Sequence, residues 1–371
     1  MIHPTKAKHI RGYAVVLLIL FGVVCSVTAA DRDQDGIGGT GNTSVGPVQR
    51  FGSIFVNGRE YFLSEHTSIT ADGASLNERD LRLGDVVVVQ GRVDAASGRS
   101  QALRIAVEQA LQGLVEKVDV EARTVTVLGQ VVRVMPDTFG ETPDGKPFSL
   151  TQVRVNESIA VSGLMREDGS WTATRVSRPV VSTAGDVPFM LRGTLRALDR
   201  ARGALTIGTQ TLTVTPQRLP PDLAVGQSVY ARGYYRAGLP QAQAVQLERR
   251  DLGPVGSHVE IAGHIQSHPA LGQAVCNGTL VRYGEDTQFI GGMTAQLTPG
   301  MPVAIQGILR ADGSVAAARI MLRADFLHAE LPRQPTALHE KGPRPLEQQP
   351  PRPERPSIER PSIDRPQRPF M

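Results

Sequence analysis

The chain has 371 residues, with 40 Lys and Arg against 36 Asp and Glu, and aromatic residues make up 5% of it. The nearly balanced charge, with no clustered basic stripe, excludes the usual sequence signature of a nucleic-acid-binding protein. Two cysteines are too few for a disulfide framework, which excludes the small disulfide-stabilised class of secreted domain.

Residues 1–30 have the features of a secretory signal peptide. The basic residues Lys6, Lys8 and Arg11 precede an apolar run over 13–24, and small residues end the segment. The run is shorter than the ~20 residues that a membrane-spanning helix needs. We therefore predict a periplasmic or extracellular protein whose mature chain has no transmembrane segment, with a retained anchor as the alternative.

Lipidation at Cys25 is a second alternative for the N-terminus. It is disfavoured because Val24 stands where lipoprotein processing expects a small residue. Signal cleavage without lipidation removes three basic residues and leaves 37 Lys and Arg against 36 Asp and Glu. The mature chain therefore offers no net charge that would favour nucleic acid.

Residues 31–43 are rich in Gly and Asp and are predicted to form a flexible leader. The sequence Asp31-x-Asp33-x-Asp35-Gly36 resembles the start of a calcium loop, but the twelfth position is Asn42 where such loops carry a bidentate Glu. No flanking helices are evident in the sequence, so a calcium site is not expected.

A motif with constant spacing recurs four times after the leader. Each copy begins with Leu or Val, has Gly or Asn three residues later and Gly seven residues after that; the copies begin at Leu81, Val153, Leu223 and Leu297. A fixed repeat indicates one small module used several times. The predicted modules are 44–108, 111–179, 189–249 and 258–323, with linkers at 180–188 and 250–257.

Alternating β-branched and polar residues within each module predict short, half-buried strands, as in Thr124–Val127. Asn57-Gly58 has the sequence of a type I′ hairpin turn. Gly84 of the motif is predicted to be left-handed, since Asn156, the next most tolerant residue type, replaces it in the second module. The fold class is all-β, with four tandem small OB-like five-stranded β-barrels. A plain five-stranded meander is the alternative.

Residues 324–371 differ in composition from the modules. Proline, arginine and glutamate dominate, and the pattern Arg-Pro-Ser-Ile is duplicated at Arg355 and Arg360. Such a segment cannot bury a core and is predicted to be a soluble disordered tail, with a partner motif or a spacer as the alternatives.

Metal-ligand residue types gather in the fourth module, at His258, His264, His268 and Cys276. His and Cys are common ligands of zinc and copper. The repeat opposes a metal site, because His268 aligns with the apolar core position Val118 of the second module. We predict ordinary strand residues here, and no metal or cofactor.

Three aromatic residues follow the fourth strand of a module: Trp171, Tyr234 and Tyr235. Aromatic side chains on such barrels can stack on sugars or bases, but so few are more typical of packing. The motifs of a nucleophile elbow, a zinc protease and a phosphate loop do not occur in the sequence. The chain is therefore predicted not to be an enzyme.

A family resemblance rests on the leader Gly36–Gly41, the strand pair Phe51–Gly58 and the repeated Leu-x-x-Gly strands. These resemble the bacterial domain-of-unknown-function family numbered 5666, which implies exported, repeated small β-domains and brings no catalytic residues. The predicted function is an exported non-catalytic binding or scaffold protein of the cell envelope. The expected partner is an envelope protein or polysaccharide; the alternative is a metal- or glycan-binding protein that uses the histidines of the fourth module or exposed aromatics.

Overall fold

The computed structural model describes residues 41–94, 97–141, 149–179, 186–291 and 297–322. Within them the regular structure is β-strand with three short 3₁₀ turns, so the chain is all-β as predicted. No helix of this part is long and apolar enough to cross a membrane. The predicted signal peptide with Cys25, most of the predicted leader and the predicted tail lie outside the described residues.

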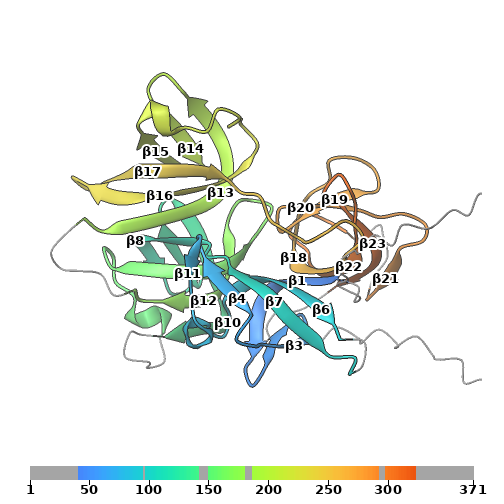
Figure 1. Cartoon of the computed structure of the whole chain (residues 1–371). Helices are drawn as coiled ribbons and strands as arrows, with labels where there is room; N and C mark the ends of the chain where they lie inside the picture. Colours follow the sequence, from blue (N-terminus) through green and yellow to red (C-terminus); the bar gives the residue numbers. More distant parts are fainter. Residues whose placement is uncertain (1–40, 95–96, 142–148, 180–185, 292–296, 323–371) are drawn as a thin grey trace, which may run out of the picture.

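Hydrogen-bonded strand pairs close the first module into a barrel (Figure 1). The ring runs β1–β2–β3–β7–β6 and back to β1, with β3 and β7 parallel and the other neighbours antiparallel. A hairpin of β4 and β5 extends the sheet beside β7. The strands are β1 (Gly41–Arg50), β2 (Ile54–Val56), β3 (Arg59–Phe62), β4 (Ser68–Ala71), β5 (Ala74–Ser75), β6 (Val86–Val93) and β7 (Ser100–Val107).

The other three modules close in the same order of pairing. The second barrel has β8 (Leu111–Asp119), β9 (Thr124–Val127), β10 (Gln130–Glu141), β11 (Ser158–Met165) and β12 (Trp171–Ser177). The third has β13 (Pro188–Asp199), β14 (Ala204–Ile207), β15 (Gln210–Val214), β16 (Ser228–Arg236) and β17 (Leu239–Leu247). The fourth has β18 (His258–Ser267), β19 (Gln273–Cys276), β20 (Thr279–Arg282), β22 (Pro302–Leu309) and β23 (Val315–Leu322), with β21 (Gln288–Ile290) beside β23.

In each ring the first strand pairs with the second and fourth, and the third pairs in parallel with the fifth. This is a Greek-key barrel of the OB type and differs from the meander alternative, in which only chain neighbours would pair. Where an OB barrel carries its helix, the first three barrels have a single 3₁₀ turn. These turns are η1 (Glu78–Asp80), η2 (Leu150–Gln152) and η3 (Pro216–Arg218).

Every second side chain along a strand points into the barrel interior, as the sequence predicts. In β9, Val125 and Val127 are at most 1% exposed, whereas Thr124 and Thr126 are half-buried on the outside. Burial of such aliphatic side chains is the main stabilising contribution, at about 25 cal/mol per Å² of apolar surface removed from water.

The first glycine position of the repeated motif, where the second module has Asn156, is confirmed to be left-handed. The φ angles are +82° at Gly84, +68° at Asn156, +92° at Gly226 and +87° at Gly300. Each of these residues donates its backbone N–H to a carbonyl of the first strand of its own barrel. The motif therefore turns the chain into the fourth strand and ties that turn to the first.

The later glycine of the motif, at Gly91, Gly163, Gly233 and Gly307, has a different role. Each lies at a register shift between the fourth and fifth strands. A Cβ there would press against a backbone carbonyl of the fifth strand; at Gly163 it would lie 2.7 Å from the Thr172 oxygen. A β-bulge with no room for a side chain explains this recurrence.

Strands of different barrels also pair with one another. β1 runs parallel to β18, with Asn42 opposite His258, and β8 pairs antiparallel with β13. The first and fourth barrels thus share one sheet of 13 strands, and the second and third share one of 10 (Figure 1).

Strand β1 corrects one predicted boundary. It begins at Gly41, inside the segment 31–43 that we predicted as leader and before the predicted module start at 44. Asn42 and Thr43 are buried, and their side chains donate to the Ser100 hydroxyl and the Leu252 carbonyl. These partners lie far along the chain, so the sequence around residue 43 gave no sign of them.

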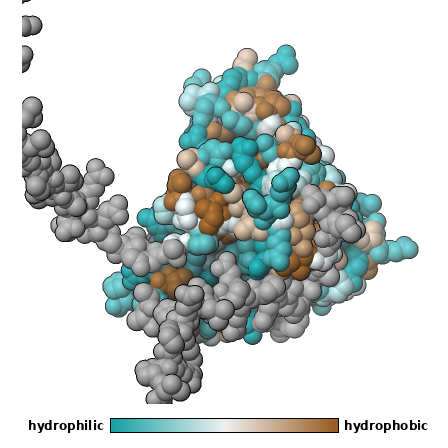
Figure 2. All heavy atoms as spheres, turned by 90° about the vertical axis from the view of Figure 1, so that its right-hand side faces the viewer, coloured by the Kyte–Doolittle hydropathy of each residue, from teal (hydrophilic) through white to brown (hydrophobic). Residues whose placement is uncertain are grey.

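The face of the molecule that carries the fourth barrel is shown in Figure 2. In the uncovered part of this view, hydrophobic residues form separate groups among hydrophilic ones. Exposed hydrophobic residues include Val255, in the segment that precedes β18, and Leu271, between β18 and β19. Single exposed apolar side chains of this kind are usual on soluble domains.

Candidate functional site

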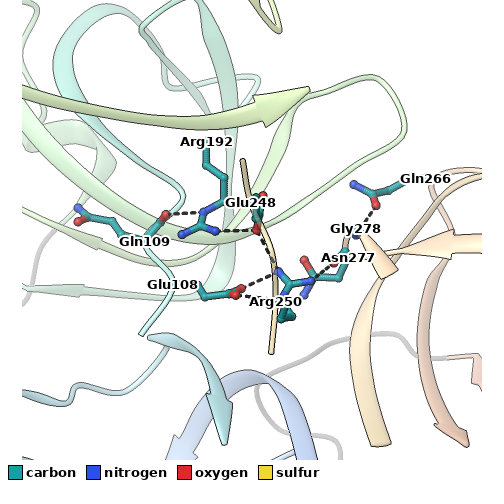
Figure 3. A network of polar contacts seen from close by, with 8 residues as sticks. All are labelled: Glu108, Gln109, Arg192, Glu248, Arg250, Gln266, Asn277 and Gly278. Carbon is teal, nitrogen blue, oxygen red and sulfur yellow. Dashed lines mark hydrogen bonds and ion pairs between the residues drawn. The ribbon is translucent and has the colours of Figure 1, made fainter. Parts of the chain in front are cut away.

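A buried network of ion pairs lies where the barrels meet (Figure 3). Arg250 donates to both carboxylate oxygens of Glu108, at 2.8 Å from Nε and 2.6 Å from Nη2. It also lies 3.4 Å from Glu248, whose carboxylate is 2.6 Å from Arg192. All four side chains are 10–14% exposed. The network is therefore a nearly dry cluster of two arginines and two glutamates.

The network draws its members from distant parts of the chain. Glu108 follows β7 of the first barrel, Arg192 is in β13 of the third, and Glu248 follows β17. Arg250 also donates to the Asn277 carbonyl in the β19–β20 turn of the fourth barrel. Arg192 donates to the Gln109 carbonyl, in the connection to the second barrel, at 3.1 Å. All four barrels or their connections are thus fastened at one point.

Electrostatics at this junction favour the ionised form of Glu108. Burial alone would raise the pKa of Glu108, but the charge and hydrogen bonds of Arg250 outweigh it, so that pKa lies below its usual value. The pKa of Arg250 is raised, because its glutamate partners outweigh the effect of burial. The segment 250–257, predicted as a linker, therefore begins with a structural anchor.

His264 lies at the contact between the second and fourth barrels and has polar contacts on both of its ring nitrogens. Its Nε2 lies 3.0 Å from the Thr172 hydroxyl and its Nδ1 lies 3.1 Å from the Gly300 carbonyl. Burial is the largest effect on this ring and lowers its pKa to about 4. Both nitrogens are engaged within the protein, so His264 acts as a joint between barrels.

The depressed pKa of His264 predicts an acid-sensitive contact. The folded pKa of about 4 lies below the usual ~6.5 of the unfolded state, so the unfolded chain binds the proton more tightly. The stabilisation is complete above pH ~6.5 and is lost as the pH falls toward 4. Between pH 7.5 and 4.5 the parent should lose roughly 2–3 kcal/mol more unfolding free energy than His264→Gln, measured by urea titration. His66→Gln, at a side chain 86% exposed, is the control and should track the parent; equal losses in all three proteins would contradict the assignment.

A cleft of about 580 Å³ opens beside the ion-pair network, between the second, third and fourth barrels. This volume lies within the range of about 300–1,000 Å³ typical of ligand sites, which favour domain junctions. One wall is the β11–β12 loop, which corresponds to a ligand-binding loop of OB barrels. The lining residues with polar or charged side chains are Arg166, Glu167, Thr194, Arg196, Gln227, Ser228, Glu248, Arg249, Gln266 and Ser267.

The charged groups of the cleft differ in how firmly they are held. Glu248 is fixed by the buried arginines, and Glu167 lies 3.5 Å from Arg166. Arg249 pairs with Asp222 at 2.9 Å but is 78% exposed. Arg196 is exposed on β13. The cleft thus combines two exposed arginines with carboxylates that are already paired with other arginines.

The four residues considered as metal ligands, for which we predicted ordinary strand roles, do not form a group. Cys276 is buried in the core of the fourth barrel, where burial raises the pKa of its thiol to about 12. His268 contacts the Gln273 carbonyl at 3.1 Å, and His258 begins β18 opposite Asn42. The described residues contain no cluster of three or more His, Cys, Asp or Glu able to hold a metal.

The predicted aromatic residues serve mainly in packing. Trp171 is 3% exposed within the shared core of the second and third barrels. The Tyr235 hydroxyl accepts the Leu114 backbone N–H at 3.2 Å, and its ring packs edge-on against Phe189 at 5.8 Å. Tyr234 is 37% exposed. Trp171 and Tyr235 thus pack in the core that the second and third barrels share, whereas Tyr234 does not.

Sequence reasoning missed a second surface, on the first barrel. Phe55 of β2 lies under the Arg50 guanidinium at 4.0 Å from the ring centre, and Phe62 of β3 under Arg99 at 5.0 Å. Strands two and three are the usual ligand face of OB barrels. The positions that match Phe55 in the other barrels are Thr126, Thr206 and Val275, so comparing the copies would have found it.

Comparison with known proteins supports the family and leaves the activity open. A comparison with curated proteins gives no match. Among solved structures, drosophila Unr CSD456 is 14% identical, covering 47% of this chain and 84% of that one, with a TM-score of 0.17. A Streptococcus pneumoniae multidomain protein with nucleic acid binding domains is 12% identical, covering 57% and 72%, with a TM-score of 0.16. Scores this low do not bear on function.

A family profile described as "Domain of unknown function (DUF5666)" matches residues 43–106, 112–177 and 262–321. The matches coincide with the first, second and fourth barrels and together cover about half of the chain. The third barrel lies outside them although it closes in the same order, and it lacks the Asp-Gly turn after the fourth strand. The chain belongs to the DUF5666 family.

Proposed function

We propose that this chain is an exported, non-catalytic binding protein of the cell envelope, in which four barrels form one scaffold around a ligand cleft. The observation that carries the proposal is the buried ion-pair network joining the barrels beside the cleft. A cleft whose walls are fixed to one another needs little ordering when a ligand binds, which favours affinity.

The chemistry of the cleft supports binding over catalysis. Its two carboxylates, Glu167 and Glu248, are both paired with arginines. Glycoside hydrolysis needs one carboxyl group that donates a proton and a second that attacks or activates water. A neighbouring arginine favours the carboxylate form, so two carboxylates that are both paired with arginines leave no good candidate for the proton donor. Nucleophilic catalysis needs a nucleophile beside a base; Cys276 and His264 are both buried, and neither is among the residues that line the cleft.

Export is supported by the sequence of residues 1–30, with its basic start, apolar run and small final residues. We expect a mature chain that begins at Asp31, without lipid at Cys25.

The proposal is tested by fractionating the source organism and measuring the intact mass of the recovered protein. We expect a chain starting at Asp31 in the periplasmic or extracellular fraction, which sediments with purified envelope polysaccharide and leaves its length distribution unchanged. A full-length chain in the cytoplasm would overturn the location, and a diacylglyceryl group on Cys25 would place the protein on a membrane. Shortened polysaccharide would replace binding by hydrolysis.

A further inference from the structure

We propose that the three-barrel cleft binds an acidic oligosaccharide, a sugar chain whose residues carry carboxylates. This rests on the proposed function and adds the chemical class of the ligand. The elements that build the site are the β11–β12 loop, the outer side of the third barrel and the β18–β19 region of the fourth.

Two glutamine side chains in the cleft are already oriented as donors. The Gln227 amide oxygen accepts the Ala224 backbone N–H at 2.7 Å, and the Gln266 amide oxygen accepts the Gly278 N–H at 2.7 Å. Since each oxygen is fixed by a backbone donor, the amide NH₂ group is the end available to a ligand. With the hydroxyls of Ser228 and Ser267, these groups match the hydroxyls of a sugar.

The arginines of the cleft favour a ligand that carries negative charge. Arg196 and Arg249 are exposed, Arg166 is 24% exposed, and Glu248 is already neutralised by the buried arginines. Guanidinium groups bind carboxylates through paired hydrogen bonds, which are among the stronger polar contacts in proteins. A carboxylate on the ligand therefore complements this surface better than a neutral sugar does.

One more feature of the wall favours a ligand with hydroxyl groups. Arg166 Nε and Glu167 Oε2 have no hydrogen-bond partner within the described residues. The two atoms are buried although the side chains that carry them are 24% and 30% exposed, so the wall holds one donor and one acceptor without a partner. A sugar hydroxyl can satisfy both, because it donates and accepts at once.

The lining disfavours other polymers. Its described residues include no aromatic side chain, whereas single-stranded nucleic acid is held largely by bases stacked on aromatic rings. Its apolar side chains are Met165, Leu247 and Val275, which offer no deep aromatic pocket of the kind that anchors protein partners. A hydroxyl-rich, negatively charged chain is the class that remains.

The test uses the mature chain and tetragalacturonic acid as the probe, with maltotetraose and an oligothymidylate for comparison, in titration calorimetry. We expect that tetragalacturonic acid binds and that the other two probes do not. Its affinity should fall as the salt concentration rises from about 0.05 to about 0.3 M. The double variant Arg196→Gln, Arg249→Gln should bind at least about tenfold more weakly. Arg232→Gln, an exposed arginine of β16 outside the cleft, should bind like the parent.

Several results would overturn this assignment. Equal binding of maltotetraose would remove the role of charge, and preferential binding of oligothymidylate would change the class of ligand. If the double variant Phe55→Ala, Phe62→Ala loses binding and the arginine double variant keeps it, the binding site lies on the first barrel. If tetragalacturonic acid does not bind but the protein still sediments with envelope polysaccharide, the assignment of an acidic ligand is wrong and the proposed function stands. If neither is observed, the proposed function is refuted as well.

Discussion

Replacing Arg250 with methionine is expected to lower the free energy of unfolding by about 3–5 kcal/mol, the cost of removing one partner from a buried ion pair. Methionine fills similar volume but leaves Glu108 and Glu248 in a nearly dry junction, with Arg192 as the remaining arginine of the network. The hydrogen bond to the Asn277 carbonyl of the fourth barrel is lost as well. Urea unfolding followed by circular dichroism measures the change.

Arg249 is the matched control, since it is the preceding residue, of the same type, and 78% exposed. Arg249→Met should cost less than about 1 kcal/mol, as surface ion pairs usually do. The pair is tested further by Glu108→Gln combined with Arg250→Met, which should cost less than the sum of the two single changes. Unfolding of Arg250→Met at the parent's urea midpoint would show that the network does not hold the barrels.

Alanine at Gly163 is expected to destabilise the protein by about 1–3 kcal/mol, through overpacking at the bulge between β11 and β12. Its Cβ would lie 2.7 Å from the Thr172 carbonyl oxygen and 3.3 Å from the carbonyl carbon. Backbone atoms of a paired strand cannot move aside as a flexible side chain can, so the strands must shift. Thermal and urea unfolding both report the loss.

Gly284→Ala provides the comparison for that substitution. Gly284 is exposed, and a Cβ there would meet no atom within 4 Å. Alanine at such a site should be neutral, or stabilising by up to about 1 kcal/mol through the unfolded state. Equal effects at both glycines would mean that backbone entropy, not the bulge, explains the recurrence of Gly163.

Local features of the fold were predictable because they depend on neighbouring residues. The alternation in Thr124–Val127 gave the strand, and Asn156 in place of glycine revealed the left-handed position. The closing pair of each barrel was not predictable, since β3 meets β7 only after about 40 intervening residues. For that reason the OB-type barrel and the meander stayed open until the pairing was known.

The site was harder to predict than the fold. Arg250 and Glu108 are 142 residues apart, and a charged residue in a short connecting segment has the sequence appearance of a solvated linker. His264 and Cys276 drew attention as metal ligands because of their chemistry, yet each is explained by packing partners. Burial of these residues depends on how the barrels meet, which one copy of the repeat does not encode.

The measurement that most directly tests the four-barrel scaffold compares two probes of urea unfolding. Trp171, the single tryptophan, lies in the second barrel, whereas far-ultraviolet circular dichroism reports all four. We expect coincident transitions in the parent, as for one cooperative unit, and equal shifts of both probes in Arg250→Met. A Trp171 transition that stays in place while the dichroism transition splits would contradict it, because the barrels would then unfold as independent units.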